Sequence, residues 1–112
     1  MKKIEAIIRP EKLDSVRHAL EEISSPGLMI TEIEGHGKQK GITRQWRGKE
    51  YKVELLSKIK IEVIVKDKDV GHITKAITEA AYTGSIGDGK IFVYPVENVS
   101  RIRTREEGES AI

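Results

Sequence analysis

A glycine-rich segment near the C-terminal end of the chain has the composition of an anion-binding loop. It reads TGSIGDGK over residues 83–90 and runs directly into the strand-like IFVY. Because glycine readily adopts positive φ, successive backbone N–H groups can point at one anion, and Lys90 adds a positive charge. We predict a phosphate cradle for a nucleotide, although Gly-Asp-Gly is equally good chemistry for a plain turn. The segment is not a P-loop, because no Lys-Ser/Thr pair opens a helix after it.

Two motifs of the chain resemble those of the PII nitrogen-regulatory signal proteins. One is Thr83 followed, after three residues, by GDGKIFV, and the other is WRGKEY over residues 46–51. The likeness runs from residue 1 to about residue 104 and covers most of the chain. It implies one domain over residues 1–112, with a T-loop at about 37–55, a nucleotide loop at about 82–90 and a C-terminal segment at about 97–112.

The resemblance also implies a function, that of a non-enzymatic sensor in nitrogen regulation. Members of the family bind ATP or ADP, Mg²⁺ and 2-oxoglutarate, and their T-loop controls an ammonium transporter or a nitrogen-assimilation enzyme. We favour the branch that is associated with ammonium transporters. Such a protein would meet a membrane only through its transporter partner.

Composition is consistent with one small domain. The chain has 112 residues, and its hydrophobic fraction of 38% is adequate for a single modest core. A net charge of +2 does not demand nucleic acid or an acidic membrane as a partner. Without cysteine there is no disulfide framework or thiolate metal site, and no apolar run is long enough for secretion or membrane spanning. We therefore expect a cytoplasmic protein.

An internal repeat predicts the elements that must position the glycine loop. The segment KIEAIIR at residues 3–9 returns as KIEVIVK at residues 60–66, and both are strand-like. Each is followed by apolar residues at helical spacing, and then by a further strand near residues 28–35 and 90–96. The order β-α-β-β-α-β predicts an α+β, ferredoxin-like fold with both helices on one face of the sheet and a long loop between the second and third strands. The family resemblance implies the same fold.

Two helices leave one face of that sheet uncovered. Along the first strand Ile4 and Ala6 alternate with Lys3 and Glu5, so neither face is wholly polar. A half-covered apolar sheet in a short chain indicates self-association, and the sequence alone allows a dimer as well as a trimer. The resemblance implies a homotrimer with nucleotide sites between neighbouring subunits.

The long segment between the two repeats is rich in basic residues and has no clear apolar period. A structureless connection of this length is usually functional, and Trp46 beside Arg47 is typical of a protein-contact anchor. A flexible, solvated loop is the alternative. By the resemblance, Arg47 enters the pore of an ammonium transporter, and Tyr51 matches a tyrosine that some bacterial relatives modify.

Further ligand residues are assigned by the resemblance, position by position. Phosphate contacts are expected from the glycine loop and from two arginines that we place on an extended C-terminal segment, where they would point the same way. The base pocket and the base of the T-loop complete the nucleotide site. The residues expected at the nucleotide are Ile7, Met29, Gly35, Gly37, Lys38, Gln39, Ile64, Gly87, Asp88, Gly89, Lys90, Arg101 and Arg103.

The resemblance places a second ligand, 2-oxoglutarate, beside the nucleotide. Lys58 matches the lysine that pairs with one carboxylate, and Arg9 approaches from the adjoining strand. Gln39 would help to hold Mg²⁺ between ATP and the keto acid, while backbone N–H groups of Lys40 and Gly41 complete the site.

Two other functions compete with the sensor. A ferredoxin-like sheet also serves RNA-recognition motifs, which need exposed aromatic residues on central strands. We expect the two strand aromatics, Phe92 and Tyr94, on opposite faces, which disfavours nucleic acid as a partner. A weak ATPase is the third possibility, with Asp88 orienting water.

Overall fold

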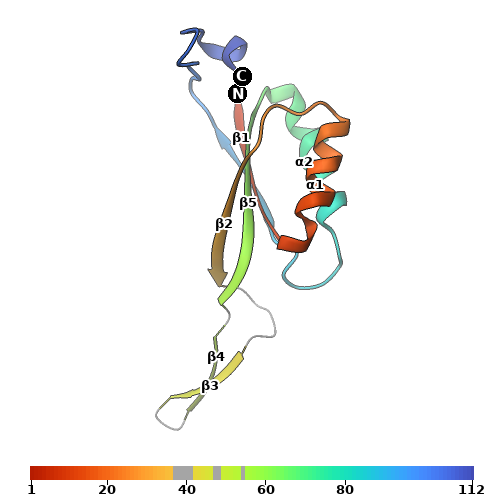
Figure 1. The fold of residues 1–112 in the computed structure, drawn as a ribbon, viewed down its shortest axis with the longest axis vertical. Helices are drawn as coiled ribbons and strands as arrows, with labels where there is room; N and C mark the ends of the chain where they lie inside the picture. The colour runs from red at the N-terminus through yellow and green to blue at the C-terminus, as the bar shows by residue number, and fades with distance from the viewer. Residues whose placement is uncertain (37–41, 47–48, 54) are drawn as a thin grey trace.

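The computed structural model describes residues 1–36, 42–46, 49–53 and 55–112. These residues form an α+β fold with both helices on one side of a sheet (Figure 1). The elements are β1 (Lys2–Ile8), η1 (Pro10–Lys12), α1 (Leu13–Glu22), β2 (Met29–His36), β3 (Ile42–Trp46), β4 (Lys49–Val53), β5 (Leu55–Val65), η2 (Asp67–Asp69), α2 (Val70–Ala81), β6 (Lys90–Pro95) and η3 (Gly108–Ala111).

The main sheet has the strand order β2-β5-β1-β6, and neighbouring strands are antiparallel. The two repeats supply the central strands β1 and β5, which pair with each other from Lys2 and Val65 to Ile8 and Ile59. Each central strand leads into a helix, and each helix leads back to an edge strand. The predicted β-α-β-β-α-β order and ferredoxin-like fold are therefore confirmed.

Strand alternation and helix periodicity together build the core. On β1 every second side chain is buried, namely Ile4, Ala6 and Ile8. The same face of β5 contributes Ile59, Ile61, Val63 and Val65. The helices cover this face with Val16, Leu20, Ile73 and Ile77, all nearly inaccessible to solvent. The two helices thus cover one face of the sheet, and the opposite face is not covered by either helix.

The opposite face of the sheet, which we call the open face, mixes charged and aromatic side chains. Lys3 lies 3.4 Å from the Glu62 carboxylate and its ammonium stands 4.7 Å from the centre of the Tyr94 ring. The Tyr94 hydroxyl donates to Glu5 at 3.2 Å. Phe92 and Tyr94 keep 42% and 41% of their surface exposed. Lys3 and Lys60 of this face lie 3.4 Å and 3.7 Å from the Glu62 carboxylate, so acidic side chains neutralise part of its positive charge.

The expectation that Phe92 and Tyr94 lie on opposite faces is wrong. Residues two apart on a strand point to the same side, and the two rings are 6.4 Å apart on the open face. They also lie on β6, at the edge of the sheet rather than its centre.

Two local features also differ from the sequence-based expectation. The segment between the repeats contains the antiparallel pair β3–β4, rather than lacking structure throughout. Asp67 and Asp69 were candidates to cap α2, but neither makes a side-chain capping bond at the start of α2 or η2. The Asp67 carboxylate instead lies 2.9 Å from the amino group of Met1, which places the N-terminal end of β1 beside η2.

Candidate functional site

The glycine loop between α2 and β6 is closed by one carboxylate. Asp88 accepts hydrogen bonds from the backbone N–H groups of Thr83 and Gly84, each at 2.9 Å, and from the Thr83 hydroxyl. Gly84, Gly87 and Gly89 all have positive φ, between 88° and 106°, which permits the sharp path between these fixed points. Thr83, which sequence reasoning used only as part of a motif, is thus a structural partner of Asp88.

Two basic side chains from outside the loop hold it as well. The Arg9 guanidinium donates from Nε to Asp88 Oδ1 at 3.1 Å and from Nη2 to the Ile86 carbonyl at 2.9 Å. Lys58, on β5, donates from Nζ to the Gly87 carbonyl at 2.6 Å. Two of the residues assigned to the 2-oxoglutarate site, Arg9 and Lys58, therefore meet at the glycine loop.

These contacts shift the pKa of two ionisable groups. Hydrogen bonds from Thr83, Gly84 and Arg9 hold the pKa of Asp88 well below its usual range, with the Thr83 side chain contributing most. Desolvation, followed by the charge of Arg9, lowers the pKa of Lys58. The loop is thus held by a carboxylate that stays ionised at neutral pH.

The low pKa of Asp88 predicts how stability should respond to acid. Because this pKa is lower in the folded chain than in the unfolded one, the stabilisation is complete above about pH 4 and is lost as pH falls further. Asp88→Asn should therefore lower the free energy of unfolding at pH 7, and this deficit should shrink between pH 4 and pH 2. Urea unfolding at a series of pH values measures it, with the exposed Glu97→Gln as control. A deficit that does not change with pH would mean that Asp88 acts through something other than its charge.

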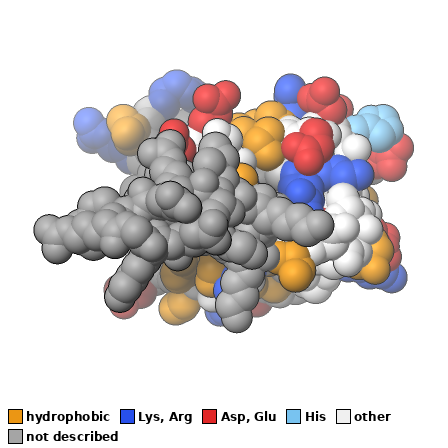
Figure 2. Space-filling model, turned by 90° about the horizontal axis from the view of Figure 1, so that it is seen from below, with side chains coloured by type: hydrophobic (Ala, Val, Ile, Leu, Met, Phe, Trp, Pro, Cys, Tyr) orange, Lys and Arg blue, Asp and Glu red, His pale blue; other side chains and the backbone are white. Residues whose placement is uncertain are grey.

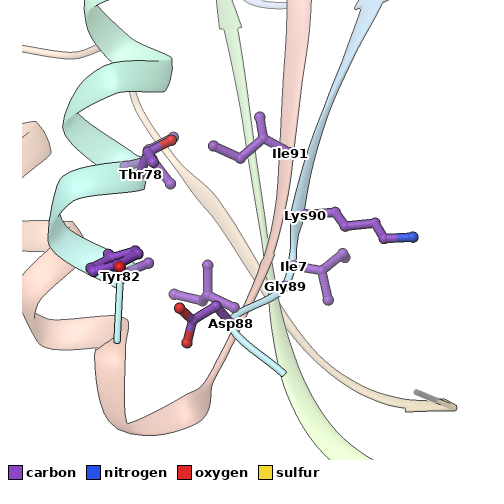
Figure 3. Close-up of a pocket in the computed structure, with 10 residues that line it drawn as sticks. Ile7, Thr78, Tyr82, Asp88, Gly89, Lys90 and Ile91 are labelled. Carbon is purple, nitrogen blue, oxygen red and sulfur yellow. The ribbon is translucent and has the colours of Figure 1, made fainter. Parts of the chain in front are cut away.

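The loop separates two different surfaces (Figure 3). On the helix side, Thr78, Tyr82, Asp88 and Ile91 help to line a hollow of about 230 Å³. Ile7 and Lys90, which are paired between β1 and β6, point the other way, toward the open face. The predicted base-pocket residue Ile7 and phosphate ligand Lys90 thus share a side of the sheet.

A second group of predicted site residues lies at the other end of the sheet. Ile64 pairs with Lys3, whereas Ile7 pairs with Lys60 and Lys90, so the two isoleucines are about 13 Å apart at the usual rise of a strand. The C-terminal segment with Arg101 and Arg103 also lies at this end, opposite the glycine loop (Figure 1). Met29 pairs with Glu62, between the two ends. Within one chain, these residues do not form a single site.

The C-terminal arginines do not lie on an extended segment, so that expectation is wrong. The N–H of Arg105 donates to the Arg101 carbonyl at 2.8 Å, and Arg105 has a positive φ of 62°. Arg101 bonds the Glu106 carboxylate at 3.0 Å, while Arg103 is exposed. The chain therefore turns between Arg101 and Arg105, and Glu106 binds Arg101 but not Arg103.

Most residues at the base and tip of the T-loop lie outside those that the structure describes. Gly35, next to the last residue of β2, pairs with Leu56 of β5, and Trp46 and Tyr51 belong to the paired strands β3 and β4. Figure 2 views the molecule from this end, where Lys and Arg side chains of the described residues lie next to Asp and Glu. The predicted residues that lie outside the described ones are Gly37, Lys38, Gln39, Lys40, Gly41 and Arg47.

Comparison with known proteins gives the family of the chain. The family model described as "Nitrogen regulatory protein P-II" matches residues 1–106. Proteins of that name from Azospirillum brasilense and Pasteurella multocida are 57% and 56% identical over 112 residues, which is the full length of each chain. "Nitrogen regulatory protein P-II 1" of Escherichia coli is 54% identical over the same length. The chain belongs to the P-II family.

Membership of the P-II family supports nitrogen regulation as the general role of the chain. The names of these relatives describe regulatory proteins rather than enzymes. Regulation of this kind acts on partner proteins. Across the described part of this P-II chain, no helix combines the length and apolar character that a membrane span requires.

Proposed function

We propose that the chain is a cytoplasmic nitrogen-regulatory sensor that binds ATP or ADP at the glycine loop. The observation that carries the proposal is the loop itself, a run with three glycines at positive φ fastened by Asp88, Arg9 and Lys58. A loop fixed before the ligand arrives loses little conformational freedom on binding. Gly87, Gly89 and Lys90 then serve the phosphates, and Ile7 serves the base.

The division of the site residues between the two ends of the sheet favours sites shared by neighbouring subunits. One subunit would supply Ile7, Gly35 and the glycine loop, and its neighbour would supply Met29, Ile64, Arg101 and Arg103. The open face, with its half-exposed Phe92 and Tyr94, is the surface that such an assembly would cover. We propose a homotrimer on this basis.

A trimer has a mass that is easy to measure. Light scattering at micromolar concentration should give about three times the chain mass of 12.6 kDa. A monodisperse monomer under these conditions would contradict both the assembly and the shared nucleotide site.

The second ligand of the proposal is 2-oxoglutarate. Lys58 and Arg9 supply positive charge at the edge of the glycine loop, close to the start of β5 and the base of the T-loop. Gln39, Lys40 and Gly41 would complete the site, with Gln39 helping to hold Mg²⁺. Effector binding at the loop base would favour one arrangement of the T-loop over another, since a ligand shifts states only by its differential affinity for them. The T-loop would then control an ammonium transporter or a nitrogen-assimilation enzyme.

Calorimetry of ATP, ADP and 2-oxoglutarate, alone and in combination, tests this proposal. Lys90→Ala or Arg103→Ala should weaken nucleotide binding about ten- to a hundredfold, because each removes a charge-assisted contact of roughly 1.5–3 kcal/mol. Loss should be similar for ATP and ADP if the contact is to a phosphate that they share. Lys75→Ala, on the exposed side of α2, is the matched control. Unchanged affinity in both variants would place the nucleotide elsewhere.

A further inference from the structure

The orientation of the glycine loop depends on contacts to its carbonyl groups. Arg9 bonds the carbonyl of Ile86 and Lys58 bonds that of Gly87, so two successive peptide groups are held by cations from outside the loop. In a trans peptide the N–H points opposite to the C=O. The N–H groups of Gly87 and Asp88 are therefore turned away from Arg9 and Lys58, which leaves them available to an anion.

Arg9 has a second hold on the loop, through Asp88. Its Nε bonds the same carboxylate that accepts the N–H groups of Thr83 and Gly84. Only 17% of the Arg9 side chain and 24% of the Asp88 side chain is exposed, so water competes weakly for this pair. One guanidinium thus joins the end of β1 to both the carboxylate that closes the loop and the carbonyl at its tip.

We propose that Arg9 is a positioning residue for the nucleotide loop, acting through Asp88 and the Ile86 carbonyl. The family resemblance gives Arg9 only a role at 2-oxoglutarate. A residue of that kind would leave nucleotide binding untouched when the dicarboxylate is absent. The geometry instead requires Arg9 to matter before any ligand arrives. The nucleotide part of this inference rests on the proposed function, whereas its effect on loop order does not.

The first test measures loop order without ligand. Arg9→Gln should raise amide hydrogen exchange in residues 83–90 about tenfold or more, because the loop loses both contacts of the guanidinium. Arg9→Lys, which keeps the charge but not the fork, should give an intermediate increase and serves if Arg9→Gln does not fold. Arg17→Gln, an exposed arginine on α1, is the matched control. Unchanged exchange in both Arg9 variants would overturn the proposal.

The second test measures ATP affinity by calorimetry with no dicarboxylate present. Arg9→Gln should weaken ATP about tenfold. Because both substitutions remove the Arg9–Asp88 pair, the loss of ATP affinity in the double variant Arg9→Gln/Asp88→Asn should be clearly smaller than the two single losses combined. Fully additive losses would show that the two residues act independently. If the wild type itself bound no nucleotide, the proposed function would fail while the exchange experiment still decided the role of Arg9.

Discussion

Replacing Gly89 with alanine is expected to lower the free energy of unfolding by about 4 kcal/mol or more. Gly89 has φ of +100°, and a Cβ on its backbone would lie 1.7 Å from the carbonyl oxygen of Ile7. The obstacle is the backbone of the central strand β1, where Ile7 pairs with Lys60 on one side and Lys90 on the other, so it cannot move aside. The strain of positive φ adds to the collision.

Guanidinium unfolding followed by circular dichroism measures this loss, and Gly27→Ala is the matched control. Gly27 has open space where its Cβ would lie, so that variant should remain within about 0.5 kcal/mol of the wild type. A Gly89→Ala protein as stable as the wild type would mean that the loop enters β6 by a different path.

Replacing Arg47 with alanine is expected to abolish binding to the proposed ammonium transporter and to leave ATP affinity intact. Arg47 lies outside the described residues. In the sequence it stands between Trp46 and Lys49, and these two residues form the last pair of the β3–β4 hairpin. The hairpin lies beyond the end of the sheet, away from the helices (Figure 1). A long guanidinium stem at this point can enter a narrow pore and bond the carbonyl groups that line it.

Co-sedimentation with membranes that contain the transporter tests this expectation. Protein with ADP should bind, and protein with ATP and 2-oxoglutarate should be released. Arg17→Ala, far from the hairpin on α1, serves as the control. Equal binding by wild type and Arg47→Ala would direct attention to a soluble target, with Trp46 as the next anchor to replace.

The fold was predictable because it follows from local patterns. The repeat of KIEAIIR as KIEVIVK identifies the two central strands, and alternation then selects Ile4, Ala6 and Ile61 for the core. Helical spacing selects Val16 and Ile77 in the same way. Each of these inferences uses neighbours within a few residues, where the geometry of strands and helices fixes which side chains share a face.

The contacts of the site were less predictable because they join residues that are distant in sequence. Nothing in the sequence around Arg9 indicates that its partner is Asp88, since the pairing depends on the exact path of a glycine loop. The turn after Arg101 could not be predicted because it requires positive φ at Arg105, a conformation that arginine seldom adopts. A glycine at this position would have indicated the turn, but the sequence has none there.

The opposite placement of the glycine loop and the C-terminal arginines has a consequence for mixed assemblies. If each site joins the loop end of one subunit to the arginine end of the next, a Lys90→Ala chain and an Arg103→Ala chain carry complementary defects. A ring that contains both chains always has a junction where an unaltered loop faces an unaltered arginine end. Co-expression of the two defective proteins would thus restore nucleotide affinity of the wild-type strength, which neither has alone. The site would then be a property of the interface rather than of the polypeptide.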